Sequence, residues 1–119
     1  MDHSQGYQQI QSILEVAPPV KQRILDVIND ELHASSPVMM LHEHAVHASK
    51  EVLAGRLTSS DARFWARFLL SRRDVDLEPG FELLLIDFFE DWSFPDYSET
   101  VDNDLALKWI VVLGDSPQN

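Results

Sequence analysis

The stretch from Phe81 to Trp92, FELLLIDFFEDW, limits the folds open to this chain more than any other. Eight of its twelve residues are large and apolar or aromatic, and four acids separate them. On a helix, at roughly 100° per residue, the apolar side chains would cover more than half of the circumference. Such a helix has to be enclosed by other elements rather than lie on a surface. The sequence therefore predicts an all-α fold around a central helix over residues 81–92.

The rest of the chain adds enough helical patterns for a bundle of five or six helices. Its 119 residues suit a single domain over residues 1–119, with frayed ends at 1–6 and 115–119. Apolar residues recur at helical spacing in several further stretches. These expected helices cover residues 7–17, 20–33, 37–54, 59–73 and 102–113.

Local signals set several of these helix ends. Ser36 followed by Pro37 is typical of a helix start, and Thr58 with an acid three residues later resembles a capping box. Gly55 suits the position after a helix, where a positive φ is often needed. The run from Trp109 to Leu113 would also fit a buried strand. Helix is favoured there because no partner strand is visible.

Composition bears on the compartment. The chain has no cysteine, which excludes disulfides and thiolate metal sites. Its first residues show no basic region followed by an apolar run, so a secretory signal is not expected. No apolar stretch approaches the ~20 residues that a membrane-spanning helix needs. We therefore expect a cytoplasmic protein.

The negative charge is confined to one part of the chain. The net charge is −11, and residues 1–73 contribute none of it, because eight acids balance eight bases. Residues 74–119 hold twelve acids against one base, Lys108. Such a surface repels nucleic acids and anionic membranes and attracts basic proteins. The alternative is a solvated acidic face that only aids solubility.

Three histidines crowd the sequence HEHAVH as His42, His44 and His47. Two metal ligands on one face of a helix stand three or four residues apart, as in H-E-x-x-H, but Val46 stands four after His42. Only His44 and His47 have a usable spacing, and a third ligand would have to come from elsewhere. We expect His44 to border the packed face while His47 and Glu43 face water, and we predict no metal site. A pH-responsive patch is the alternative.

No residue pattern names a reaction. The acids between Asp74 and Gly80 fail as a calcium loop, because the sixth and twelfth positions lack the required Gly and Glu. Asp87 and Asp91 lie one helical turn apart, a weak signal for acid–base chemistry on an acidic surface. There is no nucleophile motif and no phosphate-binding glycine loop. We predict no enzyme, no catalytic residue and no cofactor.

Residues 87–104, DFFEDWSFPDYSETVDND, combine acids with aromatic residues. Aromatic side chains inserted into a partner supply binding energy, and surrounding carboxylates supply steering and specificity. We expect Trp92 to be in the core. The predicted partner-binding residues are Asp87, Glu90, Asp91, Phe94, Asp96, Tyr97, Glu99, Asp102 and Asp104.

Residues 51–66, EVLAGRLTSSDARFWA, resemble a helix–turn–helix layout of small helical immunity proteins. A helix ends near Leu53, Gly55 and Leu57 follow, and a Thr58 cap opens a helix carrying Trp65. With its flanks the similarity covers residues 50–73 and points to bacterial immunity proteins of the colicin D immunity type.

The resemblance implies an acidic helical protein that binds a basic toxin nuclease domain and blocks it. It assigns no functional residue position by position. The alternative is a structural or regulatory helical protein without a toxin partner, which self-associates as a homodimer through the small residues Ala45 and Ala48.

Overall fold

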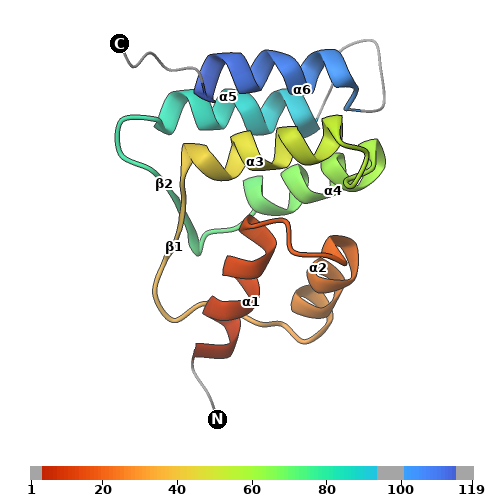
Figure 1. The fold of residues 1–119 in the computed structure, drawn as a ribbon. Helices are drawn as coiled ribbons and strands as arrows, with labels where there is room; N and C mark the ends of the chain where they lie inside the picture. The colour runs from red at the N-terminus through yellow and green to blue at the C-terminus, as the bar shows by residue number, and fades with distance from the viewer. Residues whose placement is uncertain (1–3, 94–100, 115–119) are drawn as a thin grey trace.

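Six α-helices and a short two-stranded sheet make up the part of the chain described by the computed structural model, residues 4–93 and 101–114 (Figure 1). The all-α prediction is confirmed. In chain order the elements are α1 (Ser4–Leu14), α2 (Val20–Asn29), β1 (Val38–Met40), α3 (His42–Leu53), α4 (Ser59–Leu70), β2 (Val75–Leu77), α5 (Glu82–Ser93), α6 (Asn103–Trp109) and the π-helical turn η1 (Ile110–Gly114).

The helices form stacked layers. In Figure 1, α5 and α6 lie at the top and run in opposite directions, α3 and α4 lie beneath them, and α1 and α2 are at the bottom. The helix α4 packs against α5, and α3 packs against α6 and η1. In turn, α2 packs against both α1 and α4. The α5–α6 pair therefore has its inner side on the core and its outer side free of other described elements.

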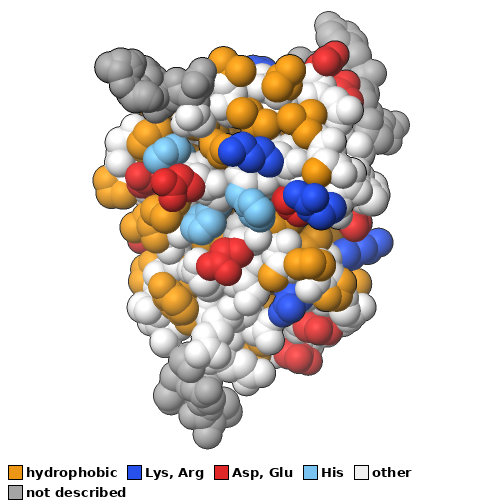
Figure 2. Space-filling view, in the orientation of Figure 1, with side chains coloured by type: hydrophobic (Ala, Val, Ile, Leu, Met, Phe, Trp, Pro, Cys, Tyr) orange, Lys and Arg blue, Asp and Glu red, His pale blue; other side chains and the backbone are white. Residues whose placement is uncertain are grey.

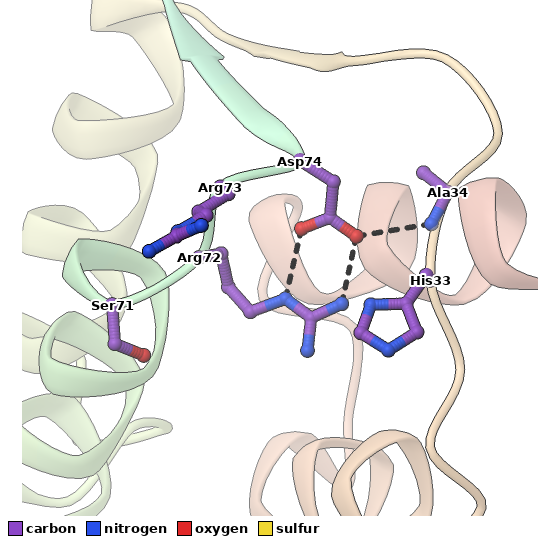
Figure 3. Close-up of a pocket in the computed structure, with 6 residues that line it drawn as sticks. All are labelled: His33, Ala34, Ser71, Arg72, Arg73 and Asp74. Atoms are coloured by element: carbon purple, nitrogen blue, oxygen red, sulfur yellow. Dashed lines mark hydrogen bonds and ion pairs between the residues drawn. The ribbon is translucent and has the colours of Figure 1, made fainter.

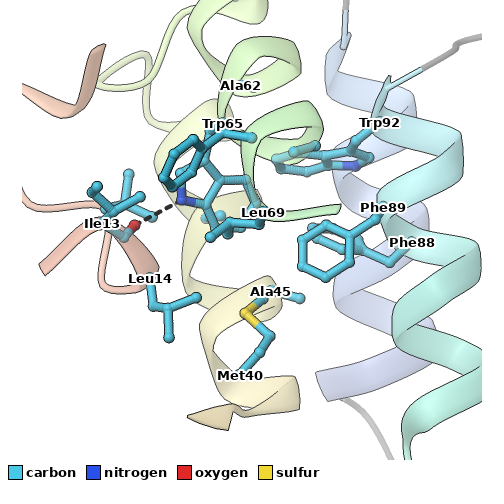
Figure 4. Packing of buried hydrophobic residues seen from close by; sticks show 14 of the residues in the cluster. Ile13, Leu14, Met40, Ala45, Ala62, Trp65, Leu69, Phe88, Phe89 and Trp92 are labelled. Carbon is cyan, nitrogen blue, oxygen red and sulfur yellow. Dashed lines mark hydrogen bonds between the residues drawn. The ribbon is translucent and has the colours of Figure 1, made fainter. Parts of the chain in front are cut away.

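Trp65 of α4 joins the lower and upper layers (Figure 4). Its side chain is fully buried, and its Nε1–H donates a 2.7 Å hydrogen bond to the carbonyl oxygen of Ile13 at the end of α1. On the opposite side, its ring packs against aromatic residues of α5 at centroid distances of 5.8–6.1 Å. These are Phe88, Phe89 and Trp92. The aromatic cluster fixes one face of α5 on α4.

The expectation that the helix over residues 81–92 is enclosed by other elements rather than lying at the surface is wrong. The helix α5 is present, and its buried positions are Leu85, Phe88, Phe89, Trp92 and Ser93. However, Leu83 is 79% exposed and Leu84 is 37% exposed. Only one side of α5 faces the core, because it belongs to the outermost layer. Its apolar residues therefore divide between the core and the surface.

The predicted helix start at Ser36 and Pro37 is also wrong. Residues 38–40 form β1, which pairs in parallel with β2, with Val38 opposite Val75. The side chains of Val38 and Met40 are buried while Met39 is exposed, an alternation typical of a strand. The strand β1 lies where the first turn of a helix was expected, and β2 (Val75–Leu77) lies where a connection was expected. A three-residue parallel pair depends on a distant segment, which local patterns do not reveal.

Other expected ends also need correction. The second helix ends at Asn29 rather than residue 33, and Glu31 has a positive φ of 52°. The fourth ends at Leu70 rather than residue 73. Residues 4–6 are helical rather than frayed, and Gly6 is buried against the carbonyl of His33. Residues 115–119 lie outside the described part.

Other local signals are confirmed. Gly55 has a φ of 79° after α3. The Thr58 hydroxyl accepts a hydrogen bond from the amide of Asp61, which caps α4. The last element is helical rather than a strand. The carboxylate of Asp102 caps it by accepting a 2.9 Å hydrogen bond from the Leu105 amide.

Candidate functional site

Five of the nine large apolar side chains that are exposed in the described residues belong to α5, α6 and η1. These five side chains are between 37% and 79% exposed. They are Leu83 and Leu84 of α5, Leu107 of α6, and Val111 and Val112 of η1. We call this surface, together with the acids beside it, the α5–α6 face. Exposed apolar side chains that gather in one place, rather than singly, mark interaction surfaces.

Contacts between the two helices fix how this face is built. The Asp91 carboxylate accepts hydrogen bonds from Lys108 Nζ at 2.8 Å and from Trp109 Nε1 at 3.0 Å. The ring of Phe88 meets that of Trp109 edge-on at 5.6 Å. In Figure 1 the two helices run in opposite directions, so the start of α5 and the end of η1 lie at the same end of the pair. The exposed leucines at 83 and 84 therefore share one end of the pair with the exposed valines at 111 and 112.

The acids of this face lie at the opposite end of the α5–α6 pair and along the exposed side of α5. Asp87 and Glu90 are exposed on α5, and Asp104 is exposed in the first turn of α6. Figure 2 shows hydrophobic side chains in its upper part and acidic side chains at its upper right, where α5 ends and α6 begins. Lys108 is the one base on the described part of α5, α6 and η1, and Asp91 pairs with it. Most of the exposed apolar side chains therefore lie at one end of the face, beside Glu82, and most of the acids lie at the other.

The predicted partner-binding residues fall into three groups. Asp87, Glu90 and Asp104 are exposed on the face, as a binding role requires. Asp91 and Asp102 are engaged within the chain, one with Lys108 and one as the α6 cap. The others lie outside the described residues. They are Phe94, Asp96, Tyr97 and Glu99.

The five exposed apolar residues were missed in the sequence. An apolar helix residue is ordinarily assigned to the core, and α5 has more apolar positions than its single buried side accommodates. One signal was present. Leu107 and Val111 lie four residues apart and follow Asp104 on the polar side of α6, opposite the buried Ala106 and Trp109. An apolar stripe on the wrong side of a helix predicts contact with something outside the chain.

His42 and His44 have structural roles. Nδ1 of His42 lies 2.7 Å from the Glu78 carboxylate, which also accepts the His42 amide, and the His42 ring stacks on Phe81 at 4.1 Å. Burial would raise the pKa of Glu78, but the hydrogen bonds from His42 outweigh it and lower this pKa. The Leu41 amide donates to Nδ1 of His44. Burial lowers the pKa of His44, which favours the neutral ring that can accept this hydrogen bond.

The predicted exposure of His47 and Glu43 is confirmed, as is the position of His44 at the edge of the core. Histidine side chains gather near the middle of Figure 2. His47 and Glu43 line a hollow of about 300 Å³ together with His42, Val46, Lys50 and Gly114. Within residues 4–93 and 101–114, no three His, Asp or Glu side chains are arranged to hold a metal ion.

A hollow of about 410 Å³ lies beside an ion pair rather than a reactive group (Figure 3). Arg72 donates from Nε and Nη2 to the two carboxylate oxygens of Asp74 at 2.9 and 2.7 Å. Arg72 Nη2 also donates to the carbonyl of Leu32, and the Ala34 amide donates to Asp74. The pair joins the segment after α4 to the segment before β1. The Arg72–Asp74 pair therefore serves the fold.

No protein-family model, curated protein or solved structure matches this chain. Among the described helices, none has both the length and the apolar character that a membrane crossing requires. Function is therefore inferred from the α5–α6 face, where exposed apolar side chains and acids come together.

Proposed function

We propose that this chain is an acidic, non-enzymatic binding protein that neutralises a basic partner, namely the nuclease domain of a bacterial toxin, and so acts as an immunity protein in the cytoplasm. The observation that carries the proposal is the α5–α6 face. It offers exposed leucine and valine side chains for burial, and its one base is already paired with an acid.

The two ends of this face would act at different stages of binding. The acids at positions 87, 90 and 104 attract a basic surface from a distance and speed association. The apolar side chains then lose their contact with water, which holds the complex together. A nuclease groove that normally binds phosphates carries the positive charge that such acids would meet. Occupying that groove would block substrate.

Self-association is less well supported. The Ala45 and Ala48 seam, which was expected to mediate it, is fully buried within the chain and packs in the interior. A symmetric pairing of two α5–α6 faces would place Asp87, Glu90 and Asp104 near the same acids of a second copy. Like charges placed together oppose association.

The test is capture of a partner followed by a functional assay. The tagged chain is incubated with lysate of the organism that encodes it, at low and at high salt. A retained basic protein is then purified and assayed for nuclease activity with increasing amounts of this chain. We expect inhibition that is complete at one molecule of this chain for each molecule of partner.

Charge reversal supplies the matched control. A triple variant with Asp87→Lys, Glu90→Lys and Asp104→Lys should slow association about tenfold or more at low salt. Reversing three exposed acids elsewhere, Asp30→Lys, Glu31→Lys and Asp76→Lys, should have a much smaller effect. Equal rates for both variants would refute a role for the face. A captured protein with no activity that this chain inhibits would refute neutralisation.

A further inference from the structure

We propose that the α5–α6 face receives a basic amphipathic helix of its partner, with the apolar end of that helix over Leu83 and Val111 and its basic end over Glu90 and Asp104. This inference rests on the proposed function, because it specifies the part of the basic partner that binds. The expected occupant is a helix with one apolar end and one basic end, rather than any positively charged surface.

The arrangement of the two helices favours a helical occupant. The helices α5 and α6 run in opposite directions and expose side chains at helical spacing, such as Leu107 with Val111 and Leu83 with Asp87. Rows of side chains spaced in this way pack best against the rows of another helix. A third helix would complete the outer layer, as amphipathic helices do when they bind to helical proteins.

The charge pattern sets which end of the partner helix lies over which end of the face. Leu83 and Glu90 are seven residues apart on α5, which is roughly 10 Å along the helix axis at 1.5 Å per residue. The partner helix therefore carries apolar side chains within about two turns and Lys or Arg within the next two. Its apolar anchors lie three or four residues apart, since they come from one side of a helix.

Other occupants fit the face less well. A second copy of this chain would bring acids against acids, since Lys108 already pairs with Asp91. An anionic lipid surface would be repelled by the same acids. A uniformly basic segment would leave the exposed leucines and valines uncovered. Only an occupant that is apolar at one end and basic at the other satisfies both halves of the face.

The experiment uses two synthetic peptides of identical composition. The first is a fluorescent helical peptide with Leu at every third or fourth position in one half and Lys or Arg on the same side in the other half. The second contains the same residues in an order that removes this division. Fluorescence anisotropy with the full chain should show that the ordered peptide binds at least tenfold more tightly than the reordered one.

A pair of variants locates the binding. Leu83→Asn with Val111→Thr changes two side chains that are more than half exposed, so the fold should be retained. This variant should weaken binding of the ordered peptide about tenfold. The control is Ile28→Asn with Leu53→Asn, which alters exposed apolar residues outside the face and should leave binding unchanged. Circular dichroism melts confirm that both variants are folded.

The outcomes separate this inference from the proposed function. Equal binding of both peptides, no binding, or an unchanged affinity of the Leu83 and Val111 variant would overturn the helix proposal. If the chain still captured and inhibited a basic protein in those cases, the proposed function would stand. If the ordered peptide bound as expected but no inhibited partner was found, the α5–α6 face would be established as a helix-binding surface. The proposal that this chain neutralises a toxin would then be refuted.

Discussion

Replacing Asp74 by Asn should destabilise the fold at neutral pH by an amount that shrinks in acid. Asp74 accepts two hydrogen bonds from Arg72, at 2.9 and 2.7 Å, and one from the Ala34 amide at 3.0 Å. The side chains of the two charged residues are only 13–14% exposed. The substitution removes the negative charge and keeps the size of the side chain, so it isolates the ionic part of the interaction.

The expected loss of unfolding free energy follows from the burial of the Arg72–Asp74 pair. Removing one member of a fully buried ion pair costs about 3–5 kcal/mol, because the other charge is left without a partner. The Arg72 guanidinium retains some contact with water and its bond to the Leu32 carbonyl, and Asn keeps one acceptor oxygen. We therefore expect the Asn variant to lose about 2 kcal/mol of unfolding free energy at neutral pH.

The pH dependence has a definite sign. Burial alone would raise the pKa of Asp74, but hydrogen bonds from Arg72 and Ala34 outweigh it, so the pKa of Asp74 is lowered in the folded state. A carboxylate with a lowered pKa contributes its stability above the unfolded pKa, about 3.9 for Asp. That contribution is lost as the pH falls through the folded pKa. The difference between wild type and variant should therefore narrow below about pH 4.

Urea unfolding followed by tryptophan fluorescence measures this difference, since Trp65 and Trp92 are fully buried. The titrations are compared at neutral pH and near about pH 3. Asp76→Asn is the control, because Asp76 is an exposed acid on β2 in the same segment and should change little. A loss for the Asp74 variant below about 0.5 kcal/mol at neutral pH, or a difference that widens in acid, would refute the reasoning.

Three further substitutions test other parts of the fold by thermal unfolding with circular dichroism. Gly6→Ala should lose about 1–2 kcal/mol, because the added methyl group would overlap the His33 carbonyl and force α1 to shift; an unchanged melting temperature would contradict the close packing. Trp65→Phe should lose about 2–4 kcal/mol through a cavity and the missing hydrogen bond to Ile13, and a loss below 1 kcal/mol would contradict that role. Thr58→Ala should lose about 1 kcal/mol by removing the cap of α4, while Thr58→Ser should retain most of it.

Much of the helical architecture was predictable because its signals are local. A hydroxyl side chain at Thr58 caps a helix whatever lies elsewhere in the chain, and Gly55 takes a positive φ that other residues adopt at a cost. The apolar spacing of residues 102–113 indicated a helix, and η1 continues it. Errors came where a distant segment competes with a local signal. Ser36 and Pro37 indicate a helix start, but the residues that follow them form β1 and pair with β2.

The acidic half of the candidate site could be predicted from the sequence, because its signal is also local, but the apolar half could not. The acids at 87, 90 and 104 were assigned to a surface, because isolated carboxylates are rarely buried. The apolar half was not found, since a leucine in a helix gives no sign of whether a neighbour covers it. Leu83 and Leu85 illustrate the difference. One is 79% exposed and the other is fully buried, although both lie in the same run of leucines.

The sequence by itself determined the helical class, the cap at Thr58, and the concentration of all net charge after residue 73. Each depends on residue type and on spacing within a few turns of chain. Only the tertiary structure decided that α5 is an outer helix and that its start and the end of η1 lie at the same end of the α5–α6 pair (Figure 1). Whether an apolar side chain becomes core or binding surface depends on which elements pack over it, and that is settled by contacts between distant parts of the chain.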